Sequence, residues 1–148
     1  MRVLVLHGPN LNLFGRREPH IYGKMTLGEI NAKLTALAAE LGIELVILQS
    51  NHEGALIDCL QEHIDSADGA ILNPGGLTQH GVSLHDCIKA MPFPVIEVHL
   101  SNLATREEWR HHSIISSAAK GTVQGMGWRS YTAGLRLVTR AARDARKK

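Results

Sequence analysis

The sequence of this chain predicts an α/β fold, namely a flavodoxin-like, doubly wound three-layer sandwich built on a five-stranded parallel sheet. Two observations support this prediction. Short apolar runs rich in Val, Ile and Leu alternate with helix-like segments, and such runs are typical of parallel strands that are covered on both faces. The chain has 148 residues, the size of one ordinary domain. No repeat or linker divides it, so we expect a single domain over residues 1–148.

Five strands are expected, because five segments combine an apolar run with flanking turn or helix-start residues. They lie at residues 3–6, 43–48, 69–72, 94–100 and 121–125.

Start signals mark the helices between these strands. A helix over residues 27–41 places apolar side chains on one stripe, and Thr26 with Glu29 has the spacing of a capping box. Ser50 and Glu53 repeat this spacing and predict the start of a second helix. Two further helices are expected, over residues 82–90 and from about residue 130 into the tail.

Composition narrows the class of protein. The formal net charge is only +2, and the basic residues of the last helix fit a solvated face better than a nucleic-acid surface. No window approaches the roughly 20 apolar residues of a membrane span, and no signal peptide is recognised. Cys59 and Cys87 both lie in helix-like segments, so we expect two core thiols and a reducing, cytoplasmic location. Neither a nucleic acid nor a membrane is an expected partner.

The connection after the first strand carries the most distinctive residues. About 17 residues separate it from the first helix, whereas strand-to-helix loops usually have about 2–6 residues. This loop contains Arg16, Arg17 and Tyr22. A phenol is a poor base at its ordinary pKa of about 10, but a neighbouring cation favours the phenolate. We therefore expect a lid at about residues 11–25 that carries a tyrosine base; a solvated surface loop is the alternative.

The end of the fourth strand carries a second candidate group. In an open parallel sheet, ligands bind beyond the carboxyl ends of the strands. Glu97 and His99 are two residues apart at such an end and therefore point to the same face. Glu97 can fix the tautomer of His99 and favour its protonated form, which makes His99 a candidate general acid. The alternative is a purely structural pair.

Other strand-end residues suit binding. Asn73 offers a donor and an acceptor, and Arg110 can bind hydroxyl or carboxylate groups. No metal-ligand spacing, Walker loop, dinucleotide fingerprint or serine elbow is recognised, so neither a metal nor a cofactor is expected. A tyrosine base with a histidine acid suits proton abstraction beside a carbonyl, enolate stabilisation and loss of a hydroxyl. The residues thus favour a cofactor-independent elimination of water.

Ordered motifs run along nearly the whole chain. They are Gly8-Pro-Asn-Leu-Asn12, Gly15-Arg-Arg-Glu-Pro19 with Tyr22-Gly23, Gln49-Ser-Asn-His-Glu-Gly54, Asn73-Pro-Gly75, Glu97-Val-His-Leu-Ser-Asn102 and Arg106-Glu-Glu-Trp-Arg110. In these motifs the chain resembles the type II 3-dehydroquinate dehydratases. The resemblance implies a flavodoxin-like subunit of a homododecamer, described as four trimers, acting on 3-dehydroquinate in the shikimate or quinate pathway.

The resemblance implies catalytic roles for five residues. Tyr22 would remove the proton from C2 of 3-dehydroquinate, with Arg17 favouring its phenolate. Asn10 would help to hold the water that stabilises the enolate oxygen. His99, held by Glu97, would protonate the departing C1 hydroxyl, which yields 3-dehydroshikimate.

The resemblance also implies a set of binding residues. Asn73 and the backbone amides of Leu100 and Ser101 would hold the substrate carboxylate. Arg110 would bind ring hydroxyls, helped by Asp86 from a neighbouring subunit.

The chain departs from the family pattern at Gln79, where the family usually has a histidine that contacts a substrate hydroxyl. The catalytic set is intact, so this departure bears on recognition of the ring hydroxyls. Two alternatives remain open: a paralogue with another cyclic hydroxy-acid substrate, and a non-catalytic small-molecule-binding protein on the same scaffold.

Overall fold

The computed structural model describes residues 1–148 and is built on a five-stranded parallel sheet in the order β2-β1-β3-β4-β5. This order is that of flavodoxin-like folds. The predicted fold class is therefore confirmed, and each expected strand is present close to its expected bounds. The strands are β1 (Arg2–His7), β2 (Glu44–Gln49), β3 (Gly69–Asn73), β4 (Val95–His99) and β5 (Gly121–Gln124).

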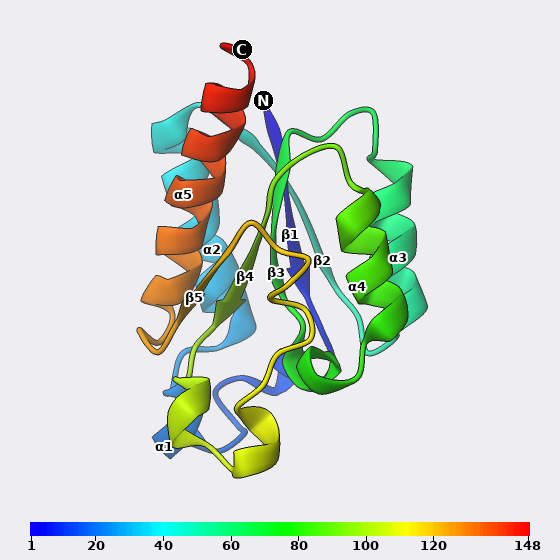
Figure 1. The fold of residues 1–148 in the computed structure, drawn as a ribbon. Helices are drawn as coiled ribbons and strands as arrows, with labels where there is room; N and C mark the ends of the chain where they lie inside the picture. Colours follow the sequence, from blue (N-terminus) through cyan, green and yellow to red (C-terminus); the bar gives the residue numbers. More distant parts are fainter.

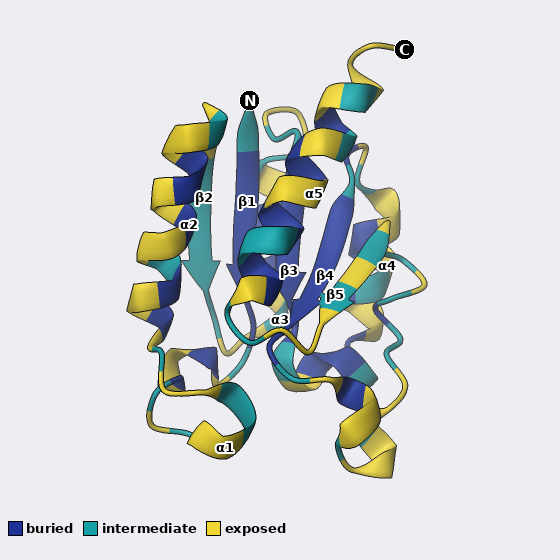
Figure 2. Ribbon diagram, turned by 90° about the vertical axis from the view of Figure 1, so that its left-hand side faces the viewer, coloured by how far each residue is buried: buried dark blue, intermediate teal, exposed yellow.

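Helices cover both faces of the sheet, which makes three layers (Figure 1). Side chains of successive strand residues point to opposite faces, so Val3 and Val5 pack in one apolar cluster, and Leu4 and Leu6 pack in another. Figure 2 shows the three inner strands buried along nearly their whole length, while the edge strands are more exposed. One face carries α2 (Leu27–Leu41) and α5 (Arg129–Ala145), and the other carries α3 (Glu53–Glu62) and α4 (Val82–Ala90).

Of the two capping boxes predicted from the sequence, one is present in the structure and the other is not. Thr26 caps α2, and its Oγ1 accepts the N–H of Glu29 at 3.1 Å. Ser50 does not cap α3, which begins at Glu53 after His52. The N–H of Ser50 still donates to a β1 carbonyl, that of His7, at 3.0 Å, so Ser50 continues the sheet ladder. Its hydroxyl accepts the N–H of His52 at 3.0 Å instead.

Short helices gather beyond the carboxyl ends of the strands, at the end of the molecule opposite the two termini (Figure 1). Leu11 and Phe14 are buried, so the long first connection is anchored to the core and is not a wholly solvated loop. The short helices are η1 (Leu11–Leu13), α1 (Pro19–Tyr22), η2 (Gly75–Gln79), η3 (Leu103–Thr105) and η4 (Glu108–Arg110).

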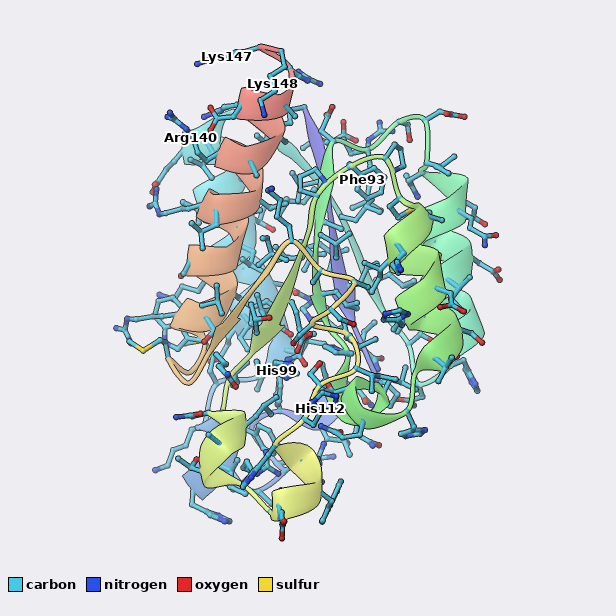
Figure 3. All side chains as sticks on the ribbon, viewed as in Figure 1. Phe93, His99, His112, Arg140, Lys147 and Lys148 are labelled. Atoms are coloured by element: carbon cyan, nitrogen blue, oxygen red, sulfur yellow. The ribbon has the colours of Figure 1, made fainter.

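The structure also tests the expectations for the two cysteines and for the basic residues of the last helix. Cys59 and Cys87 are buried free thiols, as expected. Arg140 pairs with Asp144 on the same helix at 3.1 Å, and it lies at the end of the molecule opposite His99 (Figure 3). Arg140, Lys147 and Lys148 therefore stand apart from the strand ends (Figure 3). None of the helices combines the length and apolar character that a membrane span requires.

Candidate active site

A cavity of about 320 Å³ lies beyond the carboxyl ends of the inner strands. Parallel strands place their ends at one edge, and this edge brings together segments that are far apart in the sequence. Of the candidate site residues, all but Glu97 and Asp86 line the cavity. The lining candidates are Asn10, Arg17, Tyr22, Asn73, Gln79, His99, Leu100, Ser101 and Arg110.

Tyr22 ends α1 and stands against two guanidinium groups. The Cζ atoms of Arg17 and Arg106 lie 4.9 Å and 5.3 Å from the centre of its ring, within the range of a cation–π contact. The ring also packs on Phe14, with 5.5 Å between centroids. Two guanidinium groups therefore contact the ring of Tyr22. Arg17 was expected here, whereas the contact of Arg106 with Tyr22 was not.

Arg106 and Gln79 line the cavity, and each has a buried polar atom without a hydrogen-bond partner. The side chain of Arg106 is only 8% exposed, and its Nε lies 3.9 Å from the nearest carboxylate, that of Glu107, beyond hydrogen-bond distance. Arg106 Nε and Gln79 Oε1 are the only two buried side-chain polar atoms of the chain without a hydrogen-bond partner. Such atoms are rare in native interiors, and both of these residues line the same cavity.

Glu97 and His99 form the expected pair at the end of β4. His99 Nε2 and Glu97 Oε2 are 2.5 Å apart, and both side chains are buried. The second oxygen of Glu97 accepts hydrogen bonds from the hydroxyls of Ser113 and Ser116, each at 3.0 Å. The buried carboxylate is thereby satisfied on both oxygens. Because Nε2 of His99 is engaged, Nδ1 is the ring nitrogen left for the cavity. Figure 3 shows His99 at the lower end of the sheet, above the short helices.

Close packing of two loops positions the asparagines of the cavity wall. A Cβ on Gly8 would lie 2.4 Å from the carbonyl oxygen of Pro74. Gly75 has φ +58°, and a Cβ there would lie 2.9 Å from the carbonyl oxygen of Pro9. Only glycine fits these positions without displacement. The loops after β1 and β3 can therefore approach each other closely.

The two asparagines on these loops have defined conformations. The side chain of Asn73 is buried, and its Oδ1 accepts the N–H of Gly75 at 3.1 Å. Asn10 has φ +69°, a left-handed conformation that asparagine tolerates better than most residues. Its N–H donates to Oδ1 of Asn51 at 3.0 Å, which ties this conformation to the loop after β2.

Arg110 and Asp86 differ in their relation to the cavity. Arg110 donates from Nε to Oε2 of Glu107 at 2.7 Å and lies over the ring of Trp109 at 4.0 Å, so its guanidinium is held at the cavity wall. Asp86 lies on α4 with a side chain that is 73% exposed, and it bonds His85 Nδ1 at 3.0 Å. Within one chain, the fold does not bring Asp86 to the cavity.

No three histidine, cysteine, aspartate or glutamate side chains gather closely enough to hold a metal ion.

Residues 1–139 match the family model of class II dehydroquinases. The chain belongs to the class II dehydroquinase family. The family expected from the sequence motifs is thus confirmed, and it is a family of enzymes.

Relatives and solved structures align with this dehydroquinase over most of its length. The 3-dehydroquinate dehydratase of Roseiflexus castenholzii is 55% identical over 131 residues, which is 88% of this chain and 83% of that protein. The 3-dehydroquinate dehydratase of Pelotomaculum thermopropionicum is 49% identical over 142 residues, covering 96% and 99%. The crystal structure of a type II dehydroquinase from Butyrivibrio crossotus has a TM-score of 0.91 at 36% identity, covering 93% of this chain and 97% of that one.

Sequence reasoning missed several residues that shape this dehydroquinase site. Arg106 was noted only as part of a motif. Ser113 and Ser116 lie in an irregular stretch, and neither has a neighbour at a spacing that points to Glu97. His7 and Tyr131, which lie behind Asn73, read as ordinary strand and helix residues. Their roles depend on tertiary contacts, which no local pattern records.

Proposed function

We propose that this chain catalyses the reversible trans-dehydration of 3-dehydroquinate to 3-dehydroshikimate, with Tyr22 as base and His99 as acid. One observation carries the proposal: a single cavity is lined by both side chains, with two guanidinium groups against the phenol and a buried carboxylate behind the imidazole. The substrate comes from family membership, because the curated relatives that span the chain are 3-dehydroquinate dehydratases.

The first step removes a proton from C2, which lies next to the C3 ketone. The phenolate of Tyr22 takes this proton, and the electron pair of the broken C–H bond moves onto the ketone oxygen to form an enolate. Arg17 and Arg106 favour the phenolate because each places a positive charge near its ring. Asn10 helps to hold a water that stabilises the enolate oxygen.

The second step expels the C1 hydroxyl. The enolate electrons re-form the ketone, a double bond forms between C1 and C2, and the C1–O bond breaks. His99 gives the leaving oxygen its proton, so the group departs as water. The proton comes from Nδ1, because Nε2 is bound to Glu97. The carboxylate of Glu97 stabilises the imidazolium before this transfer.

The rest of the wall binds the substrate. Asn73 and the amides of Leu100 and Ser101 hold the carboxylate, while Arg110 and Gln79 contact ring hydroxyls. Residues 11–25 form a lid over the cavity. Within it, Glu18 has φ +38°, which is uncommon for a residue other than glycine, and this strain lies beside the residue that favours the phenolate.

We further propose that the protein works as a cytoplasmic homododecamer of four trimers in the shikimate or quinate pathway. In that assembly Asp86 reaches the ring hydroxyls of a neighbouring subunit's substrate. The high exposure of Asp86 within one chain supports this part of the proposal.

The test is to incubate the purified chain with 3-dehydroquinate and follow the ultraviolet absorbance of the conjugated enone product. Turnover is expected in buffer treated with a chelator and without nucleotide. Tyr22→Phe and His99→Ala are each expected to lower kcat by roughly 10²–10⁴-fold, the usual contribution of a positioned acid or base. Near-wild-type turnover of Tyr22→Phe would rule out the phenolate base.

Matched controls remove the same types of side chain outside the cavity. Arg16→Ala removes an exposed guanidinium next to Arg17, and His112→Ala removes an exposed imidazole; neither residue lines the cavity. Both controls are expected to keep wild-type kcat. Arg17→Ala is expected to lower kcat strongly, and its loss is expected to be far from additive with that of Tyr22→Phe, because Arg17 acts through the phenol.

A further inference from the structure

We infer that His7 and Tyr131 are positioning residues that orient the amide of Asn73 for the substrate carboxylate. The inference rests on the proposed function, in which Asn73 binds that carboxylate. It adds a buried hydrogen-bonded chain that begins on α2, crosses the end of the sheet and ends at the cavity.

The sheet brings the side chains of this hydrogen-bonded series together. His7 is the last residue of β1 and Asn73 the last residue of β3, and the two are paired in the parallel ladder. Paired residues of neighbouring strands direct their side chains to the same face. This is the face covered by α2 and α5, where Tyr131 is fully buried in the first turn of α5.

The partners of His7 determine which atom donates and which accepts in each hydrogen bond of the series. His7 Nε2 lies 2.8 Å from Oδ1 of Asn31, and His7 Nδ1 lies 2.8 Å from the hydroxyl of Tyr131. An amide oxygen only accepts, so Nε2 carries the hydrogen and Nδ1 accepts the Tyr131 O–H. Burial lowers the pKa of His7 to about 4, opposed by the bond to Asn31. The ring is therefore neutral near pH 7, and one tautomer is selected.

The direction continues from Tyr131 to Asn73. Burial raises the pKa of Tyr131, and a side-chain hydrogen bond with Asn73 opposes that rise, so the phenol stays protonated. Its hydrogen is already donated to His7, and its oxygen therefore accepts from the amide nitrogen of Asn73. The amide oxygen of Asn73 accepts the N–H of Gly75 at 3.1 Å. Only one N–H of Asn73 remains, and it is available as a donor to an anionic ligand in the cavity.

This arrangement fixes which end of Asn73 a ligand meets. An asparagine amide that turned over would present its oxygen, which repels a carboxylate. The N–H of Gly75 and the hydroxyl of Tyr131 together oppose the turn, the first by donating to the amide oxygen and the second by accepting from the amide nitrogen. Tyr131 can accept because His7 takes its hydrogen. His7 and Tyr131 do not line the cavity themselves, so they act on the ligand through Asn73.

The first test is Tyr131→Phe, assayed with 3-dehydroquinate. The variant removes one of the two contacts that orient the amide, so KM is expected to rise about tenfold while kcat stays within about threefold, the signature of a loss in uniform binding. Thr139→Val is the matched control. Thr139 lies on the same helix, is 1% exposed and donates its hydroxyl hydrogen to the carbonyl of Leu135 at 2.7 Å. It is expected to lower Tm and to leave KM unchanged.

A double-mutant cycle separates positioning from a structural role. If Tyr131 acts through Asn73, then Asn73→Ala with Tyr131→Phe has the KM of Asn73→Ala alone. Independent multiplication of the two effects, or an unchanged KM in Tyr131→Phe, would overturn the inference. Inactivity of the wild-type chain would instead contradict the proposed function, and this inference would fall with it.

A second pair of variants decides the matter if Tyr131→Phe does not fold. His7→Gln keeps one acceptor and one donor on a side chain of similar volume, whereas His7→Leu keeps neither. We expect His7→Gln to hold KM within about threefold of wild type and His7→Leu to raise it about tenfold. Equal KM values in the two variants would overturn the inference.

Discussion

Gln79 has one hydrogen-bonding atom in use and one free. Its Nε2 donates to the carbonyl oxygen of Arg110 at 3.2 Å, whereas its Oε1 is buried without a partner. A buried acceptor that lacks a partner carries a desolvation cost. A ligand hydroxyl that donates to Oε1 would remove this cost. Gln79 lines the cavity, and under the proposed function its nitrogen is anchored while its oxygen is the atom left for a ring hydroxyl.

We expect Gln79→His to change KM and its pH dependence more than kcat. A neutral histidine can accept the same hydrogen bond, but a protonated one cannot. The KM of the variant is therefore expected to rise as pH falls through about 6.5, the ordinary histidine pKa, beyond any rise in the wild type. Steady-state kinetics of both proteins between about pH 5.5 and 8 provide the measurement. A large gain in kcat would instead indicate that the natural substrate of this chain lacks or displaces that hydroxyl.

Single residues of the site differ in how far the sequence predicts them. The contact between Glu97 and His99 was predictable, because alternate strand residues share a face. The bond between His7 and Tyr131 joins residues 124 positions apart. Tyr131 also packs in the apolar cluster of the α2 and α5 face, so the sequence pattern of α5 indicates a core residue and is silent on its hydroxyl.

At the scale of elements, the stretch between η4 and β5 supports the end of β4. It has no strand or long helix, yet its backbone is tied down: Ile114 N–H donates to the carbonyl of Thr78 at 3.0 Å, and Lys120 N–H donates to that of Val95 at 2.8 Å. This anchoring places Ser113 and Ser116 against Glu97. The Glu97–His99 end of the cavity thus depends on an irregular segment as much as on the strand.

We expect the double variant Ser113→Ala with Ser116→Ala to lower kcat about tenfold or more. It leaves one oxygen of a buried carboxylate without donors, and hydrogen bonds to charged groups are worth about 1.5–3 kcal/mol. Glu97 then holds His99 less firmly, so kcat is expected to fall more than KM rises. Kinetics and a thermal melt provide the measurement, with Ser66→Ala, an exposed serine away from the cavity, as the control. Unchanged kcat would show that the serines are not needed to hold the pair.

The elements also show where spacing alone is insufficient. Thr26 and Ser50 stand at the same distance before a glutamate, but only Thr26 caps a helix. The N–H of Ser50 is bound to β1, so the chain is still extended at Ser50 and cannot also enter a helix there. A capping box is a local signal, and the sheet ladder that overrides it is formed by residues more than 40 positions away.

At the scale of the whole molecule, the buried core and the candidate site occupy different parts of the fold. The inner strands are buried on both faces, and the short helices gather at one end (Figures 1 and 2). This layout was predictable, because alternating apolar runs and helices determine the layers and parallel strands place their ends together. The assembly is different. No sequence pattern around Asp86 predicts a partner, and its exposure in the structure does not identify one. Only the family resemblance suggested that Asp86 serves a neighbouring subunit.

Asp86 provides the test of the assembly. If its carboxylate binds a ring hydroxyl across a subunit contact, Asp86→Ala is expected to raise KM about tenfold or more, since a hydrogen bond to a charged group is lost. The assembled mass, measured by light scattering, is expected to stay that of a dodecamer. Asp58→Ala removes an exposed carboxylate from the adjacent helix α3 and is expected to change neither quantity.

Mixed assemblies make this prediction specific to a shared site. Subunits carrying Asp86→Ala keep Tyr22, and subunits carrying Tyr22→Phe keep Asp86. When the two are co-expressed, some cavities combine an intact Tyr22 with an intact Asp86 from a neighbour. At substrate concentrations below the raised KM, the mixture is expected to be more active than either pure variant. A mixture no more active than the average of its parents, or a monomeric mass for the wild type, would show that Asp86 does not serve a neighbouring subunit's site.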